Sequence, residues 1–311
     1  MSFEHTEVSF KSSDGTHTVY GEIYVPKGTP IRGVLQLSHG MTDHVGRYGE
    51  LARFVTARGF VFAGHCHIGH GKSVSTEDEL GFFALKHGVE ILIEDMRLMN
   101  GLLKERFGGA PIIVMGHSMG SFIARIFTAR YPESVSALII HGTSGPNKAV
   151  FAGKALVRVM SFFKGKKYRS KFVKNVASRG YNKKFPKEEG PNAWLTRDTE
   201  LANEKLSDPL GNYTFTLSAY ADLFRLVESA NSKLWFRSYP NYMPTLIVSG
   251  DMDPVGGYGK GVRYVCNELL RRGHTALTLK LYEGARHELF NEINREEVFS
   301  DIVDWMDQVK L

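Results

Sequence analysis

Cysteine is scarce in this chain of 311 residues, because only Cys66 and Cys266 occur and they lie far apart in the sequence. Two isolated cysteines exclude a disulfide framework and a zinc site built on paired cysteines. Long hydrophobic runs are also missing: no stretch approaches 18 continuous apolar residues, and the N-terminus mixes charge and serine without an apolar segment. We therefore expect a soluble protein of a reducing compartment, the cytoplasm.

The composition is that of a globular protein, with 42% hydrophobic residues and 39 Lys and Arg against 33 Asp and Glu. A chain of this length can bury a sizeable core, so a disordered or fibrous protein is excluded. The excess of positive charge is local, because residues 151–190 hold 12 Lys and Arg but only two acidic residues, Glu188 and Glu189. The basic character therefore belongs to one segment and not to the whole chain.

Strand and helix patterns alternate along most of the sequence. The turn residues Ser13-Asp14-Gly15 separate two strand patterns and predict a hairpin. Short apolar runs then alternate with helical periods, and this rhythm predicts an α/β fold with a parallel sheet and helices on both faces. The predicted strands after the hairpin are 33–38, 60–63, 111–115, 135–141, 245–249 and 277–282, and the predicted helices between and after them are 48–57, 89–103, 121–130, 262–271 and 296–309.

The rhythm stops near residue 145 and resumes near residue 243. We therefore predict a core made of residues 1–144 and 243–311, with an insertion at 145–242 that includes the basic segment. Within the insertion, Ala152, Leu156, Val159, Met160 and Phe163 fall on one face of a possible helix, opposite Lys154, Arg158 and Ser161. Either this face packs on the core, or it lines an acyl-binding cleft while the cations face an anionic lipid surface.

A serine stands between the predicted strand 111–115 and the helix that follows, in Gly116-His117-Ser118-Met119-Gly120. A tight strand-to-helix turn requires small neighbours and projects the serine hydroxyl from the end of the sheet. This context favours Ser118 as a nucleophile over a simple glycine-rich turn.

A serine needs a base, and the base needs an acid that fixes its tautomer. His287 follows the strand 277–282, and two aspartates, Asp251 and Asp253, follow the strand 245–249. Since the carboxyl ends of parallel strands meet at one edge of a sheet, we expect Ser118, Asp253 and His287 to converge there. Asp251 is the competing acid, but it is closer to the strand end and is expected to remain in the turn.

An oxyanion on the substrate requires rigid backbone donors. The N–H of Met119, at the start of a helix, is one candidate, and the N–H of Met41, in the loop after the strand 33–38, is the other. The residues His39, Gly40 and His117 are predicted to contact the substrate.

Five sequence segments together resemble the monoacylglycerol lipase and lysophospholipase branch of the α/β-hydrolase superfamily. They are His39-Gly40-Met41-Thr42-Asp43-His44 with Arg47-Tyr48, His67-Ile68-Gly69-His70-Gly71-Lys72-Ser73, Gly116 to Gly120, Gly250 to Val255, and Gly284 to Glu288. The resemblance implies an eight-stranded, mostly parallel sheet with a helical cap in the insertion, and a serine hydrolase without metal or cofactor. It also implies the roles assigned above to Ser118, Asp253, His287, Met41 and Met119.

One position departs from the pattern of this family. Relatives usually carry Asp immediately before the His-x-Gly-His-Gly-x-Ser stretch, and this chain has Cys66 there. The departure puts in question how the loop is held, and not the chemistry. A metal site of His65, Cys66, His67 and His70 is disfavoured, because consecutive residues of a strand point to opposite faces.

The leading hypothesis is therefore a serine carboxylic-ester hydrolase acting on amphiphilic acyl substrates of the monoacylglycerol or lysophospholipid type. Alternatives with the same residues are cleavage of aromatic-acid esters, thioesters or N-terminal peptide bonds, although a positively charged cap disfavours an aminopeptidase. A more distant alternative is a binding protein whose basic, aromatic-rich insertion holds lipid or nucleic acid without catalysis. The expected partners are a small acyl ester and an anionic membrane surface, and not nucleic acid.

Overall fold

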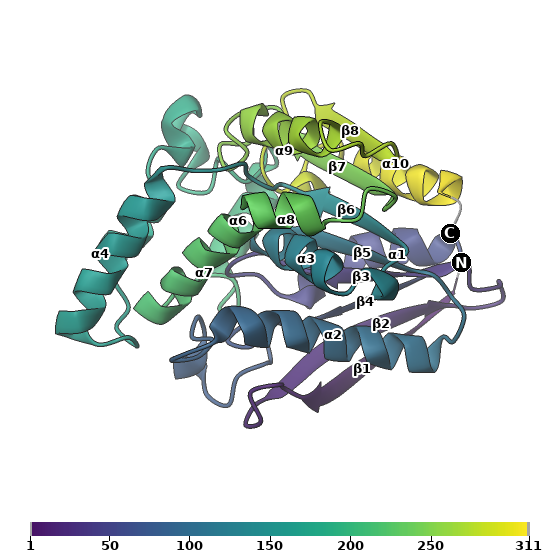
Figure 1. The fold of residues 1–311 in the computed structure, drawn as a ribbon, viewed down its shortest axis with the longest axis horizontal. Coiled ribbons are helices and arrows are strands. Elements are labelled where there is room, and N and C mark those ends of the chain that lie inside the picture. Colours follow the sequence, from purple (N-terminus) through teal and green to yellow (C-terminus); the bar gives the residue numbers. More distant parts are fainter. Residues whose placement is uncertain (1, 310–311) are drawn as a thin grey trace.

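The computed structural model describes residues 2–309 and contains one sheet of eight strands. The strand order is β1-β2-β4-β3-β5-β6-β7-β8, and Figure 1 shows this sheet at the centre of the molecule. The strands are β1 (Phe3–Lys11), β2 (Thr18–Pro26), β3 (Gly33–Ser38), β4 (Phe60–His65), β5 (Ile112–His117), β6 (Ala137–His141), β7 (Thr245–Gly250) and β8 (Leu277–Tyr282). Strands β1 and β2 form the predicted antiparallel hairpin, β2 is antiparallel to β4, and the other neighbours are parallel.

The central strands are buried on both faces, which explains their continuous apolar sequences. Every residue of β3, β4, β5, β6 and β7 is buried, whereas the edge strands β1 and β8 are partly exposed. The chain moves outward from β3 to β4 and then returns to place β5 on the other side of β3. Such a reversal of strand order is where ligands bind in open α/β sheets, at the carboxyl ends of the strands.

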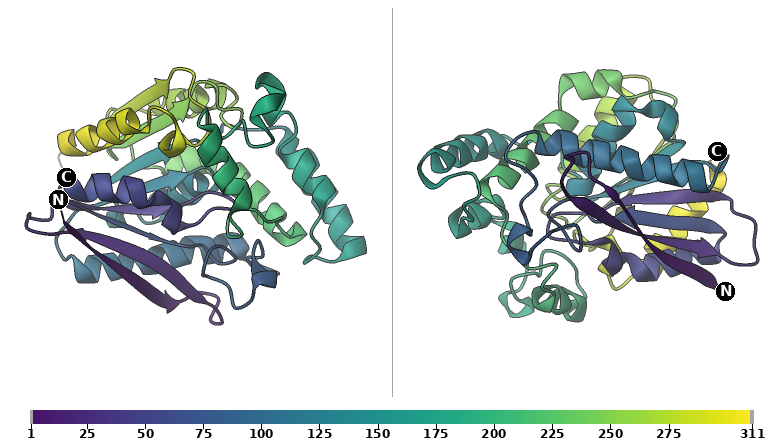
Figure 2. Two further views of the ribbon diagram at one scale, coloured as in Figure 1. Left: turned by 180° about the vertical axis from the view of Figure 1, so that it is seen from behind. Right: turned by 90° about the horizontal axis from the view of Figure 1, so that it is seen from below.

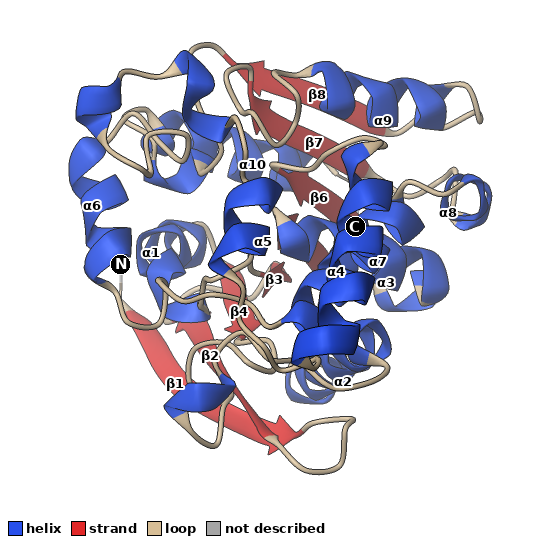
Figure 3. Ribbon diagram, turned by 90° about the vertical axis from the view of Figure 1, so that its left-hand side faces the viewer, coloured by secondary structure: helices blue, strands red, loops and turns tan. Residues whose placement is uncertain are grey.

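Helices cover both faces of the sheet, as predicted. On one face lie α1 (Gly49–Ala57) and α10 (Arg295–Gln308), and on the other lie α2 (Gly88–Arg106), α3 (Met119–Arg130) and α9 (Lys260–Leu270) (Figures 2 and 3). The apolar stripe predicted for the long helix is buried against the sheet. Its members are Val89, Leu92, Ile93, Met96, Met99 and Leu103.

The inserted segment lies between β6 and β7 and is helical. Its helices are α4 (Ala149–Lys164), α5 (Lys171–Ala177), α6 (Thr199–Ser207), α7 (Leu217–Ala230) and α8 (Lys233–Ser238). Helix α7 packs against α3 of the core, and α4 lies alongside α7 at the outer edge of the molecule (Figure 1). No helix within residues 2–309 is long and apolar enough to cross a membrane.

The predicted apolar face of α4 is wrong in part. Leu156 and Met160 pack against the core, but Ala152, Val159 and Phe163 are exposed. The helix instead turns Gly153 toward the protein, where an added Cβ atom would lie 2.8 Å from the ring of Phe224 on α7. This close backbone approach sets the rotation of α4, and it leaves aromatic side chains on the outside.

Candidate active site

The turn between β5 and α3 holds Ser118 in a conformation that few residues other than glycine adopt. Its φ is 52° and its ψ is −118°, so the backbone is strained at this residue. A Cβ atom at Gly116 would contact the carbonyl oxygen of Gly120, and a Cβ atom at Gly120 would contact the carbonyl oxygens of Ser38 and His39. The two glycines therefore allow the sharp turn that exposes the serine at the end of the sheet.

The structure brings the three predicted side chains together. Ser118 Oγ lies 2.9 Å from His287 Nε2, and Asp253 Oδ2 lies 3.0 Å from His287 Nδ1. Asp253 has no exposed surface and His287 is 2% exposed, so the imidazole and the carboxylate meet away from bulk water. Asp253 is itself fixed, because its Oδ1 accepts a hydrogen bond of 2.8 Å from the Val255 N–H.

The competing acid points elsewhere. Asp251 Oδ1 accepts a hydrogen bond of 2.8 Å from the Gly284 N–H, so this carboxylate joins the loop after β7 to the loop after β8. Asp251 therefore holds the turn that leads to His287, whereas Asp253 contacts the imidazole.

The loop after β3 lies directly against the turn that holds Ser118. A Cβ atom at Gly40 would be 3.3 Å from Ser118 Cβ, so the backbone between His39 and Met41 passes beside the serine. Met119 is the first residue of α3, where a backbone N–H has no acceptor within the helix. Both N–H groups proposed as oxyanion donors thus belong to segments that border Ser118.

The side chains of His39 and His117 are buried. His39 Nδ1 lies 2.9 Å from the Gly40 carbonyl oxygen, and its Nε2 accepts a hydrogen bond of 3.0 Å from the His67 N–H. His117 Nδ1 lies 3.1 Å from the hydroxyl of Tyr48. Burial lowers the pKa of both imidazoles. Any contact that His39 makes with substrate would therefore come from its backbone.

Two aromatic residues that the sequence analysis did not single out cover the ring of His287. The ring of Trp194 lies 5.1 Å from the ring of His287 between centroids, and the ring of Tyr181 lies 4.9 Å from that of Trp194. The His287 N–H donates to the Trp194 carbonyl oxygen over 3.4 Å. Only the excess of aromatic residues in the insertion hinted at such contacts, since no spacing rule connects residues 194 and 287.

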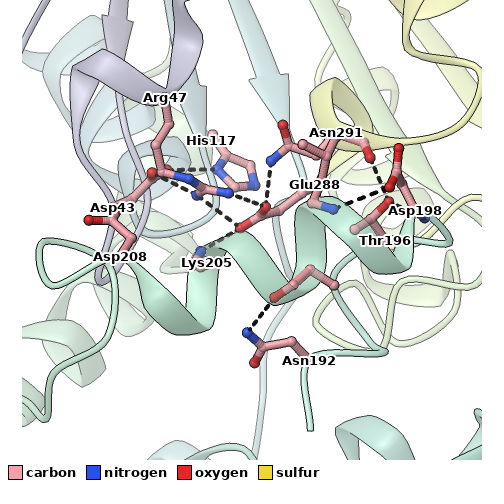
Figure 4. A network of polar contacts seen from close by, with 12 residues as sticks. Asp43, Arg47, His117, Asn192, Thr196, Asp198, Lys205, Asp208, Glu288 and Asn291 are labelled. Atoms are coloured by element: carbon pink, nitrogen blue, oxygen red, sulfur yellow. Dashed lines mark hydrogen bonds and ion pairs between the residues drawn. The ribbon is translucent and has the colours of Figure 1, made fainter. Parts of the chain in front are cut away.

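Charged residues from distant parts of the chain also meet at the residue that follows His287 (Figure 4). The neighbouring residue, Glu288, forms ion pairs with Arg47 at 2.9 Å and with Lys205 of α6 at 2.5 Å. Arg47 forms a second ion pair, of 2.9 Å, with Asp43. Asp43 and Arg47 belong to a segment that carries the family resemblance, but Lys205 had no recognisable signal in the sequence.

The position of Cys66 is explained by packing. Its side chain is 4% exposed, and burial raises the pKa of the thiol to about 11. The loop is held by hydrogen bonds to the Cys66 backbone instead: the Cys66 N–H donates to the Tyr20 carbonyl oxygen at 2.8 Å, and Ser73 Oγ donates to the Cys66 carbonyl oxygen at 2.7 Å. Across residues 2–309, no group of three or more His, Cys, Asp or Glu side chains is arranged to hold a metal ion.

The inserted segment exposes aromatic side chains next to cations. Phe151, Phe162 and Phe163 of α4 are 81%, 83% and 75% exposed. They line one side of an open groove of about 980 Å³ between α4 and α7, together with Lys86 and Arg158. A surface of this kind combines apolar area with positive charge.

Comparisons with known proteins agree on one group of enzymes. A family model described as serine aminopeptidase, S33, matches residues 29–294. The chain is 29% identical over 310 residues to the monoacylglycerol lipase of Mycolicibacterium smegmatis, covering 98% of both chains. It is 27% identical over 307 residues to the human monoglyceride lipase, covering 96% of this chain and 89% of that protein.

Solved structures give the same picture. A thermostable carboxyl esterase from Bacillus coagulans, solved in complex with glycerol, superimposes over the full length of both chains with a TM-score of 0.92 and 28% identity. A lipase in its open form has a TM-score of 0.89 and 27% identity, covering 98% of this chain and 99% of that one.

Proposed function

Because the chain belongs to the serine aminopeptidase S33 family, in its monoacylglycerol lipase-like branch with the α/β-hydrolase fold, we propose that it cleaves carboxylic esters through an acyl-serine intermediate. The observation that carries the proposal is the pair of contacts at His287, 2.9 Å to Ser118 Oγ and 3.0 Å to Asp253 Oδ2. Both distances are within reach of a proton transfer.

The geometry suggests the order of steps. Ser118 Oγ attacks the ester carbonyl carbon while its proton passes to His287 Nε2, and Asp253 stabilises the imidazolium that forms. The N–H groups of Met41 and Met119 bind the oxyanion of the tetrahedral intermediate. The intermediate collapses, His287 returns the proton to the leaving alkoxide, and an alcohol departs. Water then repeats the sequence on the acyl-serine and releases the carboxylic acid.

The relatives favour a glyceryl ester as substrate. Two of them are named monoacylglycerol lipase and monoglyceride lipase, and a third, a carboxyl esterase, was solved with glycerol. The chain spans nearly all of their length. A lysophospholipid would present a similar single acyl chain and stays within the proposal. An aminopeptidase would need free carboxylates to bind an amine, but the nearby carboxylates of Asp43 and Glu288 are already paired with Arg47 and Lys205.

The test uses a soluble ester so that membrane binding does not enter. We expect the wild-type chain to hydrolyse p-nitrophenyl butyrate and a fluorophosphonate probe to label Ser118. Ser118→Ala should abolish labelling and lower kcat by about 10⁴-fold or more. Ser75→Ala serves as the control, because Ser75 lies in the loop between β4 and α2 and is distant from Ser118 in the sequence. Retention of hydrolysis by Ser118→Ala would refute the assignment, and a panel from acetyl to oleoyl glycerol esters would define the acyl group.

The same proposal includes transient contact with an anionic membrane, where such substrates reside. Its support is the exposure of Phe162 and Phe163 beside the cations of residues 151–190. Each basic residue near an anionic surface can contribute about 1 kcal/mol.

Sedimentation with vesicles tests this contact. The wild-type chain should bind vesicles that contain phosphatidylglycerol more strongly than vesicles of phosphatidylcholine alone, and the double substitution Phe162→Ser and Phe163→Ser should weaken binding. Leu234→Ser, which removes an apolar residue of α8 that is as exposed as Phe163, is the matched control. Equal binding by all three proteins would contradict the role of α4.

A further inference from the structure

A buried glutamate directly follows the proposed base. Glu288 is 4% exposed, and its carboxylate lies between two cations that come from different parts of the fold. Arg47, in the short helix Val45–Tyr48 after β3, approaches to 2.9 Å, and Lys205, on α6 of the inserted segment, approaches to 2.5 Å. Figure 4 shows both side chains reaching Glu288, Arg47 from above and Lys205 from below.

The network continues to the other parts of the site. Arg47 also pairs with Asp43, and Asp43 Oδ2 accepts a hydrogen bond of 2.7 Å from the hydroxyl of Tyr48. That hydroxyl lies 3.1 Å from His117 Nδ1. His117 precedes Ser118, Asp43 is two residues after Met41, and Glu288 follows His287. One connected set of side chains therefore borders the nucleophile, the oxyanion loop and the base.

The charges in this network balance, with two cations and two carboxylates. Burial raises the pKa of Glu288, but Arg47 and Lys205 outweigh it, so the pKa of this carboxyl lies well below its ordinary value. The same competition between burial and Arg47 lowers the pKa of Asp43. Removing Lys205 would leave one negative charge without its partner in a buried site, which proteins tolerate poorly.

The same loop is also attached to the inserted segment by hydrogen bonds. The Glu288 N–H donates to the Leu195 carbonyl oxygen at 2.7 Å, and Arg286 Nη1 donates to the Ala193 carbonyl oxygen at 2.5 Å. Lys205 is the side chain that extends this attachment from the loop 193–196 to α6. The loop carrying His287 is thus fixed from the inserted side as well as from the sheet.

We propose that Lys205 is a positioning residue for the catalytic histidine: by pairing with Glu288, it holds the loop in which His287 reaches Ser118. The packing of α6 on the core and the ability of His287 to act as the base then depend on the same ion pair. This inference rests on the proposed function, since it assigns His287 the role of base.

The other groups around the His287 imidazole do not supply the positive charge that Lys205 provides. Ser118 and Asp253 occupy its two nitrogens, while His117 of β5 and Trp194 of the inserted segment each lie 5.1 Å from its ring. His141 of β6 is also close, and burial lowers the pKa of both His117 and His141, which disfavours their charged forms. Among these neighbours, the charged groups are the carboxylates of Asp253 and Glu288. Lys205 and Arg47 compensate the charge of Glu288.

Lys205→Met keeps the length of the side chain and removes its charge. We expect kcat for p-nitrophenyl butyrate to fall about 10- to 100-fold with KM changed less than about threefold, since a small misplacement of a catalytic group has effects of this size. The uncompensated Glu288 should also favour the protonated imidazole and move the acid limb of the pH–rate profile to higher pH.

Three further variants make the test specific. Lys205→Arg should restore most of the rate, and the double variant Lys205→Met with Glu288→Gln should return the acid limb toward its wild-type position. Lys72→Met is the matched control, because Lys72 and Glu7 form an ion pair of the same 2.5 Å length at the surface. It should leave both kcat and the pH profile unchanged.

Hydrogen exchange separates this inference from the proposed function. Peptides covering 193–197 and 286–291 should exchange faster in Lys205→Met than in wild type, whether or not the chain hydrolyses esters. Absence of wild-type hydrolysis with altered exchange would overturn the function but leave the attachment by Lys205. A wild-type rate and pH profile in Lys205→Met would overturn the positioning role, as would a loss of rate that follows thermal stability alone with an unmoved acid limb.

Discussion

Two aspartates stand two residues apart at the end of β7, and they have different partners. Asp253 lies 3.0 Å from His287 Nδ1, whereas Asp251 accepts the Gly284 N–H. We predict that Asp253→Asn lowers kcat by about 10⁴-fold, because the amide stabilises the wrong tautomer of the imidazole. Asp251→Asn keeps an acceptor for Gly284 and should cost no more than a few-fold. Steady-state rates on a soluble ester check the pair, and equal losses would contradict the assignment of the acid.

The sequence located this site because its residues follow a rule of the fold. Ser118, Asp253 and His287 each lie in the turn or loop that follows a strand, and the carboxyl ends of parallel strands share one edge. No such rule applies to Lys205 and Trp194. Their positions depend on how about 100 inserted residues fold back over that edge, so a charged or aromatic side chain at either position looks like any other surface residue.

At the scale of elements, the packing of α3 against the sheet depends on a glycine. A Cβ atom at Gly120 would contact the backbone oxygens of Ser38 and His39, which belong to the rigid end of β3 and the loop after it. We predict that Gly120→Ala destabilises the chain by about 1–3 kcal/mol, the usual cost of overpacking a core. Unfolding in urea measures the change.

Gly101 provides the control for this prediction. It lies in the middle of α2, is exposed, and has no heavy atom within 4 Å of an added Cβ. Gly101→Ala should therefore stabilise the chain by about 0.5–1 kcal/mol through helix propensity. A similar change of stability in both variants would show that the approach of α3 to β3 imposes no constraint.

Helix α4 shows where reasoning from periodicity is insufficient. A helical projection averages over all apolar residues and placed the inner face near Phe163. The real face is decided by Gly153, whose missing side chain lets α4 approach Phe224 of α7. The periodicity was sufficient for α2, where both sides of the helix have distinct character and the predicted stripe is buried. Elements on the sheet were thus predictable, while the rotation of an inserted helix required its partner.

At the scale of the whole molecule, the alternation of strands and helices predicted the parallel sheet but not the order of its strands. The order depends on the direction of each crossover, and no local pattern encodes the return of the chain from β4 to β5. The eight-stranded arrangement came from the resemblance, and the structure confirms it. The same arrangement gathers histidines at one end of the sheet, from the last residues of β4, β5 and β6 and from the loops after β3 and β4.

These histidines make stability depend on pH. Burial lowers the pKa of the six imidazoles at this end of the sheet, and for His65 and His70 the pKa falls to about 4; the six are His39, His65, His67, His70, His117 and His141. In the unfolded chain each would titrate near pH 6.5. Below that pH the unfolded chain binds more protons than the folded chain, so the stabilising contribution is complete above about pH 6.5 and is lost as pH falls.

We predict that the free energy of unfolding is nearly constant from pH 8 to 7 and then falls steeply toward pH 5, by about 1.4 kcal/mol per pH unit for each neutral buried histidine. Urea unfolding at pH 8, 7, 6 and 5 measures this slope. His65→Leu should reduce this slope, because it removes one of the buried imidazoles. Neither ring nitrogen of His65 has a hydrogen-bond partner among the described residues, so the substitution breaks no hydrogen bond of the side chain. His87→Asn, at an exposed position, is the control. A free energy of unfolding that stays constant between pH 7 and 5, or a slope that is unchanged in His65→Leu, would show that the histidines are not kept neutral by burial in the folded protein.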